Sequence, residues 1–390
     1  PRTPPQCLMN RNNTLSSTHP DAPVAIFVED LGGGGAEKIS VTLANGLAAR
    51  GIAVDMLLWR ASGPHLAALN PAVRQINLSA TRPAGIIDVI RALRRYFVES
   101  PPRVFLSQLE KPSLVAIVAA RLAGYRYVVP CVHIDLLSYM RHGHRLRRMM
   151  LIGLVALLYR FVPRIVAVSN GAAESIRRLL RPTYPPVVVV YNGFDFNALN
   201  GESATSVEAE WLCNKTSPVI IACGRLVPQK AYDVLLRAFA RVRQTVAARL
   251  IILGEGPLRM ELEAQAAQLG VTDALLMPGF VAKPAAWFAK SDLFVLSSHN
   301  EGLSNVLIEA LAIGMPIVST DCPSGPREVL ADGRFGRLVA VNDTASLAQS
   351  IIVGLNAPAV QPVAERILHL EKFSAAGMVN NYLQVISGII

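Results

Sequence analysis

The strongest constraint on the fold is a series of short, almost wholly apolar segments that alternate with helical patterns. VAIFVED (24–30) and YVVPCVH (127–133) are two of them, and their apolar residues would lie on both faces of a strand. Strands buried on both faces are typical of parallel sheets that helices cover on each side. The alternation therefore predicts an α/β fold built from doubly wound parallel sheets.

This alternation is interrupted once, by the polar stretch 195–217, and begins again at PVIIACG (218–224). A chain of 390 residues is also too long for one ordinary hydrophobic core. Both observations indicate two doubly wound domains in series, whose ligands would gather at the carboxyl ends of the strands. The expected division is a disordered segment 1–22, a first domain 23–195, a linker 196–217, a second domain 218–371 and a final helix 372–390.

Four consecutive glycines, Gly32 to Gly35, follow the first expected strand and open a helix. A backbone without side chains can come very close to a ligand at a helix N-terminus, so a binding loop is favoured over a purely structural turn. The GxGxxG spacing of dinucleotide-binding enzymes fails in both registers, because Glu37 or Lys38 stands where the last glycine belongs. The loop therefore argues against a hydride-transfer enzyme.

Two cations follow the first strand of the second half. Arg225 comes directly after the strand at 218–224, and Lys230 stands five residues later at a helix start. Such a pair suits a diphosphate, because it can neutralise the charge that grows on a leaving phosphate. Surface salt bridges would explain the pair equally well if it stood alone.

Two glutamates, Glu301 and Glu309, stand eight positions apart around a helix that begins after Ser304. Ser304 is a suitable N-cap, and the free N–H groups of the first turn would point at an anion: those of Asn305, Val306 and Leu307. Glu309 would then be within reach of a ribose whose diphosphate sits on the helix start. Glu301, ahead of the helix, could hold a second sugar. The segment thus predicts a site for a sugar, a diphosphate and a ribose, in that order.

Taken together, these motifs resemble the retaining glycosyltransferases of family 4. The stretch from Glu301 to Glu309 looks like their E-x7-E signature, and Arg225 and Lys230 match their donor-phosphate pair. The similarity covers the chain from Val24 to its end. It implies a GT-B fold, in which two Rossmann-like domains face a central cleft and the last helix crosses back onto the first domain. The nucleotide sugar would bind to the second domain and the acceptor to the first.

The resemblance also implies a role for each matching position. Glu309 would bind the ribose and Glu301 the donor sugar, while the diphosphate would be held by Arg225 and Lys230. His133, at the end of YVVPCVH, matches an active-site histidine near the transferred sugar. Taken alone, a histidine at a strand end is more often structural.

Further donor contacts would come from the backbone. The resemblance implies that Gly33 and Gly34 approach the sugar or phosphate from the first domain. Phe280 and Val281 would lie where the backbone reads the nucleobase. Ala231 departs from the family pattern, in which glycine often follows the lysine, and we expect little consequence.

The reaction that the resemblance implies is transfer of a hexose or N-acetylhexosamine from a UDP-sugar, with retention and without a metal or other cofactor. Arg225, Lys230 and the helix dipole would take the role that a divalent ion plays elsewhere, and no Asp-x-Asp motif occurs in the chain. We expect same-face attack aided by the leaving phosphate. The run CPSGPRE (322–328) resembles a subgroup that acts in bacterial surface-polysaccharide assembly, such as exopolysaccharide, capsule or O-antigen synthesis.

Positive charge is concentrated in one part of the chain. The net charge is +10, and residues 81–190 alone contain 17 Lys/Arg and 5 Asp/Glu. Within this part, basic residues flank an apolar run, 149–159, that is too short to span a bilayer. The pattern fits a protein on an anionic membrane surface and, equally, a buried helix with a basic end. With the resemblance, it predicts a lipid-linked saccharide acceptor and a peripheral place on the inner face of the cytoplasmic membrane.

Rival functions remain open at this stage. A nucleotide-sugar epimerase would share the fold without needing an acceptor, and a non-catalytic saccharide-binding protein would not need Arg225, Lys230 and both glutamates together. Nucleic acid is a weaker alternative, since no recognition motif accompanies the basic residues. The five cysteines are scattered without CxxC spacing, so no zinc site is expected.

Overall fold

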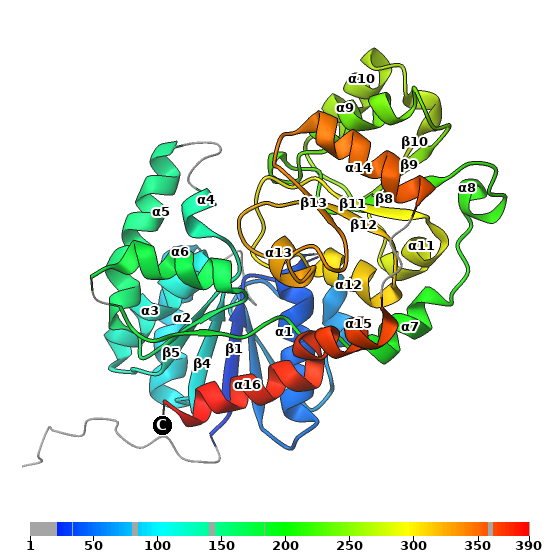
Figure 1. Cartoon of the computed structure of the whole chain (residues 1–390). Coiled ribbons are helices and arrows are strands. Elements are labelled where there is room, and N and C mark those ends of the chain that lie inside the picture. Colours follow the sequence, from blue (N-terminus) through cyan, green and yellow to red (C-terminus); the bar gives the residue numbers. More distant parts are fainter. Residues whose placement is uncertain are drawn as a thin grey trace, which may run out of the picture.

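The protein consists of two parallel sheets with helices packed around them, which form two domains side by side (Figure 1). This computed structural model describes residues 22–32, 34–79, 85–139, 145–182, 184–357 and 362–389. The segment expected to be disordered, 1–22, therefore lies outside the described residues apart from its last one. The predicted α/β class with doubly wound parallel sheets is confirmed.

The first sheet has seven parallel strands in the order β3-β2-β1-β4-β5-β6-β7. Its strands are β1 (Val24–Val28), β2 (Val54–Leu58), β3 (Arg74–Asn77), β4 (Val104–Gln108), β5 (Val128–Val132), β6 (Ile165–Ala167) and β7 (Val187–Val189). Its helices are α1 (Gly35–Ala48), α2 (Ile86–Glu99), α3 (Glu110–Ala123), α4 (Leu136–Tyr139), α5 (Arg145–Leu158) and α6 (Asn170–Leu180). Neighbouring residues of β1 belong to separate buried clusters, Ile26 to one and Phe27 to the other, so both faces of the sheet are covered.

The second sheet has six parallel strands in the order β10-β9-β8-β11-β12-β13. Its strands are β8 (Val219–Cys223), β9 (Arg249–Leu253), β10 (Leu275–Gly279), β11 (Leu293–Leu296), β12 (Ile317–Thr320) and β13 (Arg337–Val339). The helices that follow its strands are α9 (Tyr232–Val242), α10 (Arg259–Gln268), α11 (Pro284–Lys290), α12 (Asn305–Ile313), α13 (Pro326–Val329) and α14 (Thr344–Asn356), and the chain continues with α15 (Val363–Leu370) and α16 (Ala375–Ser387).

In both sheets the strand order reverses beside the first strand. β1 lies between β2 and β4, and β8 lies between β9 and β11. In open parallel sheets, ligands bind outside the carboxyl ends of the strands at such a reversal. The glycine loop follows β1, and Arg225 and Lys230 follow β8. Both points of reversal therefore carry a motif that the sequence singled out.

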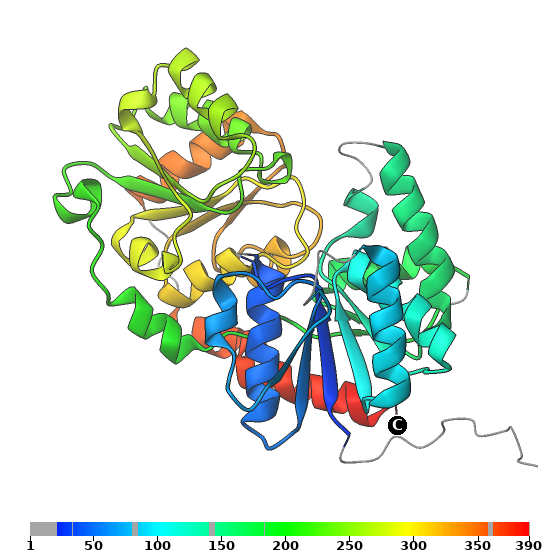
Figure 2. The same ribbon diagram turned by 180° about the vertical axis from the view of Figure 1, so that it is seen from behind.

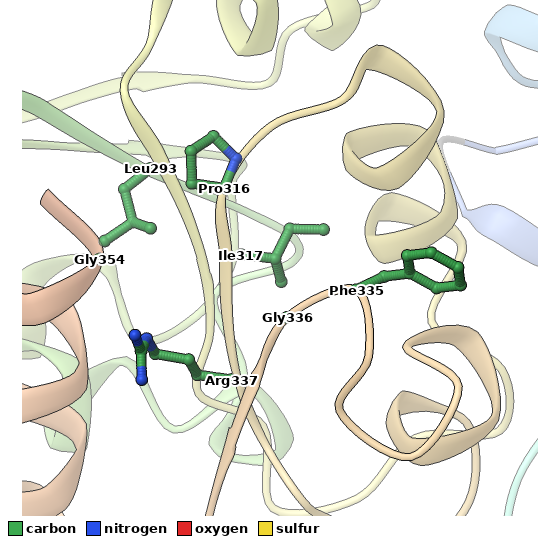
Figure 3. Close-up of a pocket in the computed structure, with 7 residues that line it drawn as sticks. All are labelled: Leu293, Pro316, Ile317, Phe335, Gly336, Arg337 and Gly354. Carbon is green, nitrogen blue, oxygen red and sulfur yellow. The ribbon is translucent and has the colours of Figure 1, made fainter. Parts of the chain in front are cut away.

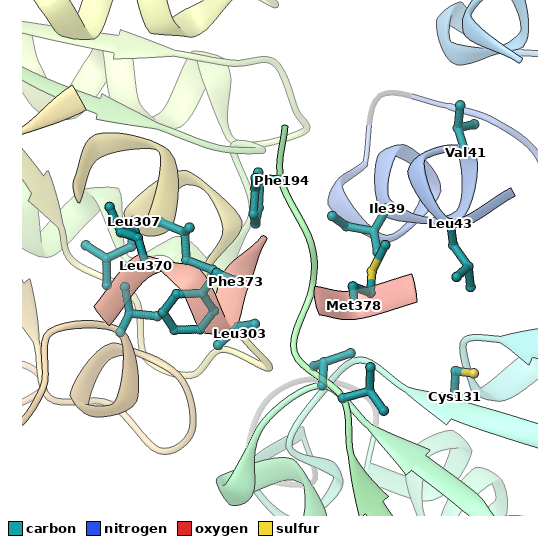
Figure 4. Close-up of a cluster of buried hydrophobic side chains, with 14 of the residues drawn as sticks. Ile39, Val41, Leu43, Cys131, Phe194, Leu303, Leu307, Leu370, Phe373 and Met378 are labelled. Atoms are coloured by element: carbon teal, nitrogen blue, oxygen red, sulfur yellow. The ribbon is translucent and has the colours of Figure 1, made fainter. Parts of the chain in front are cut away.

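The end of the chain returns to the first domain, where α16 packs against α1 (Figure 1, Figure 2). Where the chain crosses, Phe194 donates its N–H to the carbonyl of Phe373 (2.8 Å) and accepts one from Ala375 (2.9 Å). The buried cluster around the crossing joins residues of both domains, among them Ile39 and Leu303 (Figure 4). The GT-B arrangement with a crossing final helix is thus confirmed.

Three segments differ from the expectation. The edge strands β3 and β13 were not predicted, because RQIN and RLV lack an apolar run; most residues of β3 are exposed. The stretch 196–217, expected as a linker, contains two short helices, α7 (Phe196–Ser203) and α8 (Glu210–Cys213). Helix α7 packs against α11 and α12, and Asp195 caps it by accepting two backbone hydrogen bonds (both 3.0 Å).

Candidate active site

Both predicted glutamates are buried, Glu301 in the loop before α12 and Glu309 in the middle of that helix. Glu301 is 6% exposed and Glu309 is 3% exposed. A carboxylate taken out of water needs a cation or hydrogen-bond donors to compensate it. Each glutamate has a lysine: the Nζ of Lys230 lies 2.7 Å from Oε1 of Glu301, and the Nζ of Lys38 lies 2.6 Å from Oε1 of Glu309. The two lysines belong to different domains.

The pair formed by Lys230 and Glu301 is held by two loops of the second domain. Lys230 ends a short 3-10 helix after β8, and its carbonyl accepts a hydrogen bond from Ser297 (2.8 Å). Glu301 follows β11 and also accepts a hydrogen bond from the hydroxyl of Ser298 (2.6 Å). The structure therefore brings a predicted phosphate ligand and the predicted sugar ligand into direct contact.

The partner of Glu309 was missed by the sequence analysis. Lys38 lies in the first turn of α1, directly after the glycine loop, and reaches Glu309 across the domain boundary. Burial acts to lower the pKa of Lys38, but the Glu309 carboxylate outweighs it and the pKa is raised. Lys38 could have been noticed in the sequence as a cation within one turn of a glycine-rich helix start. Its partner, 271 positions away, could not be read from spacing.

Arg225 is exposed at the carboxyl end of β8. No ion pair with another described residue occupies its guanidinium, which leaves its donors available to a ligand. On the first-domain side lies Glu37, whose pKa is raised by burial, an effect that Arg225 partly opposes. Arg225 thus carries positive charge near the first turn of α1.

The first turn of α12 differs in two details from the expectation. Ser304 occupies the N-cap position but makes no capping hydrogen bond, and its buried hydroxyl has no partner among the described residues. The N–H of Leu307 is not free, because it donates to the carbonyl of Ser304 (3.1 Å). Among the residues that the structure describes, no acceptor is found for the N–H groups of Asn305 and Val306. These two remain the donors for an anion.

The first domain contributes the ends of three segments to this region. His133 follows β5, and its Nε2 lies 2.7 Å from Oε1 of Gln108. A side chain at Gly302 would overlap the carbonyl of His133, so the loop with Glu301 touches the histidine backbone. Burial lowers the pKa of His133 to about 4, which keeps the imidazole neutral at pH 7. Asn192, in the segment after β7, donates to Oδ1 of Asn305 (2.7 Å).

The remaining predicted residues lie at the edges of the site. Gly34 is the N-cap of α1, while Gly33 is outside the described residues. Phe280 and Val281 follow β10, and the side chain of Phe280 is 54% exposed. Their proposed contact with a nucleobase stays a prediction.

Two cavities of the second domain lie apart from these residues. One, of about 20 Å³, is enclosed by Leu293, Pro316 and Phe335 (Figure 3) and is too small for more than a water molecule. The other, of about 470 Å³, is lined by Arg237, Arg241 and other residues of α9, α10 and α14. Neither contains a glutamate or a lysine of the candidate site.

Comparison with known families identifies the chain. Residues 33–198 match the family described as Glycosyltransferase Family 4, and residues 217–356 match Glycosyl transferases group 1. The chain belongs to the family 4-like glycosyltransferases. It is therefore an enzyme that transfers sugars, and the resemblance inferred from the sequence is confirmed.

Relatives of this glycosyltransferase include a Campylobacter jejuni protein named N-acetylgalactosamine-N,N'-diacetylbacillosaminyl-diphospho-undecaprenol 4-alpha-N-acetylgalactosaminyltransferase, 28% identical over 84% of this chain and 88% of its own length. The lipopolysaccharide core biosynthesis glycosyltransferase LpsE of Rhizobium meliloti is 33% identical over 44% of the chain and 50% of its own length. Two solved structures share the fold. Sucrose-phosphate synthase from Thermosynechococcus elongatus has a TM-score of 0.81 (17% identity, 94% and 99% covered). Anabaena HepE in complex with UDP and glucose has a TM-score of 0.79 (18% identity, 94% and 100% covered).

Proposed function

We propose that this glycosyltransferase moves a hexose or N-acetylhexosamine from a UDP-sugar to a saccharide acceptor, with retention of configuration and without a metal ion. The proposal is carried by the two buried carboxylates, Glu301 before α12 and Glu309 within it. Carboxylates bind sugars by accepting hydrogen bonds from their hydroxyl groups. Between the two glutamates, the helix start and the cations Arg225 and Lys230 would attract a diphosphate.

The departing UDP would carry negative charge that these groups can stabilise. Arg225, whose guanidinium has no ion-pair partner in the described part of the chain, could bind two phosphate oxygens at once. Lys230 already lies beside the carboxylate of Glu301, the proposed ligand of the donor sugar. With the dipole of α12, these cations would supply the stabilisation that a divalent ion supplies in other transferases. We therefore expect activity in the presence of EDTA.

Retention would follow from attack on the face from which UDP leaves, assisted by the leaving phosphate. A double displacement instead needs a free carboxylate at the anomeric carbon. Glu301 is engaged by Lys230 and Ser298, which weakens it as a nucleophile. A glycosyl-enzyme detected by mass spectrometry after mixing with donor alone would overturn this step.

UDP as the nucleotide is supported by proteins of the same fold. HepE was solved in complex with UDP and with UDP-glucose. In this chain, the backbone after β10, at Phe280 and Val281, would receive the base.

A lipid-linked saccharide is the proposed acceptor, in bacterial exopolysaccharide, capsule or O-antigen synthesis. The names of the relatives support this class, because the Campylobacter jejuni protein acts on a diphospho-undecaprenol saccharide and LpsE acts in lipopolysaccharide core synthesis. Such an acceptor would require the enzyme to work at a membrane surface, on the inner face of the cytoplasmic membrane.

Helix α5 supports a membrane-bound position. Met150, Leu154 and Leu157 are 61%, 47% and 57% exposed, and their spacing places them on one face of the helix. In the sequence, Arg145, Arg147 and Arg148 precede these apolar residues, a composition typical of helices that lie in an anionic interface. Figure 1 shows α5 on the outer side of the first domain, away from α9 and α10. No helix of the described segments is long and apolar enough to cross a bilayer.

The first experiment measures UDP release from UDP-glucose, UDP-galactose and their N-acetylated forms in EDTA, with and without membrane-lipid extract. Release that requires the extract and is lost in Glu309→Ala would support the proposed transfer. Turnover of only a GDP- or ADP-sugar would overturn the choice of UDP. Conversion of a UDP-sugar to its epimer without release would overturn the transferase reaction itself.

The second experiment measures co-sedimentation with vesicles of anionic or neutral lipid. Leu154→Glu with Leu157→Glu should reduce binding to anionic vesicles, while Met260→Glu, on exposed α10 of the second domain, should not. Equal binding by both variants would contradict the role of α5.

A further inference from the structure

One buried hydrogen bond at the edge of the site is not explained by any predicted role. Gln108, the last residue of β4, places its Oε1 2.7 Å from Nε2 of His133. Gln108 is 2% exposed, and its own Nε2 has no partner among the described residues. A glutamine is rarely buried without hydrogen bonds for its amide. Besides His133, the side chain of Gln108 lies near the Cys131 thiol and the Tyr382 hydroxyl, where burial raises both pKa values and Gln108 acts to lower them.

The backbone after Gln108 is strained. Leu109 has φ 69° and ψ 163°, a region that residues other than glycine rarely adopt. Glu110 follows as the first residue of α3; it is 7% exposed, and its Oε1 has no partner within the described part of the chain. A turn that needed only to connect β4 to α3 could avoid both the strain and the unpaired buried oxygen. The need to connect β4 to α3 therefore does not by itself explain the conformation of residues 108–110.

Residues of β5, of α16 and of the second domain lie around this segment and His133. Gln108 pairs in register with Cys131 on β5, two residues before the histidine. Cys131 in turn accepts a hydrogen bond from the hydroxyl of Tyr382 on α16 (3.6 Å). From the second domain, Gly302 contacts the His133 backbone. His133 itself is half-buried, and among the described residues Gln108 is the side chain that hydrogen-bonds to its imidazole.

We propose that Gln108 is a positioning residue for His133, which fixes the plane of the imidazole and keeps its proton on Nε2, so that Nδ1 remains a hydrogen-bond acceptor. The proposal rests on the function above and on the prediction that His133 lies near the transferred sugar. A neutral imidazole in a fixed plane accepts a hydroxyl hydrogen bond from one direction only. Gln108 would thereby favour one orientation of the donor sugar without touching it.

The first test observes the proton directly and does not depend on activity. Protein labelled with 15N-histidine is measured by long-range 1H–15N correlation, and the His133 signal is assigned by its loss in His133→Gln. We expect the Nε2–H tautomer in the wild type and a mixture of tautomers in Gln108→Leu. A wild-type proton on Nδ1, or an unchanged spectrum in Gln108→Leu, would overturn the proposal.

The second test separates positioning from a general effect on folding. Gln108→Leu should lower kcat by about 10- to 100-fold while UDP affinity changes by less than about threefold. The control is Gln265→Leu, which removes a half-buried glutamine of the second domain that donates to the carbonyl of Asp233 (3.0 Å). Equal loss of activity in the two variants would contradict a positioning role.

Gln108→Glu keeps the acceptor but adds a charge. Its carboxylate would favour the imidazolium, raise the pKa of His133 and move the acid limb of the kcat–pH profile towards neutrality. The other titratable groups around the ring, Glu110, Cys131, Tyr382 and Glu301, are the same in both proteins. An acid limb that does not move would overturn the proposal. A wild type with the Nε2–H tautomer but without transferase activity would contradict the proposed function and leave the role of Gln108 in fixing the ring intact.

Discussion

The two lysine–glutamate pairs beside α12 differ in the origin of their lysines. Lys230 and Glu301 both belong to the second domain, and their side chains are 16% and 8% exposed. Lys38 belongs to the first domain, and its side chain is 41% exposed although that of Glu309 is only 4% exposed. The first pair can form within one domain, whereas the second requires the two domains to meet. The candidate donor site therefore has a fixed part and a part that depends on the position of the first domain.

The largest effect is expected from Lys230→Met. It removes a charge that would stabilise the departing UDP and leaves Glu301 buried without its cation. Transfer should fall by about 100- to 1,000-fold, and UDP affinity should fall with it. The control is Lys283→Met, on an exposed turn of the same domain. UDP binding unchanged by Lys230→Met would contradict a role at the diphosphate.

A third buried carboxyl, Glu110, extends the comparison because no lysine among the described residues contacts it. Burial raises its pKa from 4.5 to about 7, against the opposing effect of nearby backbone N–H groups. Between these values the folded protein holds a proton that the unfolded chain has lost, so the free energy of unfolding falls as pH rises. The shift corresponds to about 3 kcal/mol.

Glu110→Gln removes this titration. Its free energy of unfolding, relative to that of the wild type, should rise between about pH 4 and about pH 8 by that amount and then level off. Urea unfolding at a series of pH values measures the difference. A difference independent of pH would show that Glu110 titrates alike in both states.

Lys38→Met tests the part of the site that depends on domain position. Because Lys38 is partly exposed, its loss should have a smaller effect than that of Lys230, about tenfold in kcat. UDP affinity, which the proposed function assigns to the second domain, should stay within about threefold of the wild type. Isothermal titration calorimetry with UDP separates the two lysines. An equal loss of UDP affinity in both variants would abolish the distinction between a fixed and a movable part.

The smallest effect is expected from an ion pair that is exposed to solvent, unlike the pairs formed by Glu301 and Glu309. Glu174 and Arg178 lie one turn apart on α6, 2.7 Å from each other, with side chains 43% and 62% exposed. Solvent screens such a pair, so Arg178→Ala should leave both the urea midpoint and the transfer rate unchanged within error. A clear loss of stability would contradict the view that this exposed ion pair contributes less than the buried ones.

The sequence predicted the parts of the site that depend on local pattern. Glu301 and Lys230 could be predicted because each follows a strand, and parallel strands bring their carboxyl ends together, while Glu309 could be predicted from its spacing to the start of α12. Lys38 could not be assigned to Glu309, because their contact arises only when two separately folded domains meet. The N–H of Leu307 was expected to be free, since spacing does not reveal that the first turn of α12 tightens onto the carbonyl of Ser304.

The same reasoning applies to the fold. The central strands were predicted because burial on both faces demands continuous apolar sequence. The edge strands β3 and β13 escaped because an edge needs less apolar surface and their partners on the sheet, β2 and β12, supply the hydrogen bonds. Helix α7 escaped because it is short; it depends on packing against α11 and α12, besides its Asp195 cap.

The crossing of α16 has a consequence for how the protein is made. Domains commonly fold one after another as the chain leaves the ribosome. Here the first domain is synthesised early, yet the surface of α1 around Gly46 is covered by Val379, which is synthesised after both sheets. The nascent first domain must therefore wait, with an apolar face exposed, until the whole second domain has emerged.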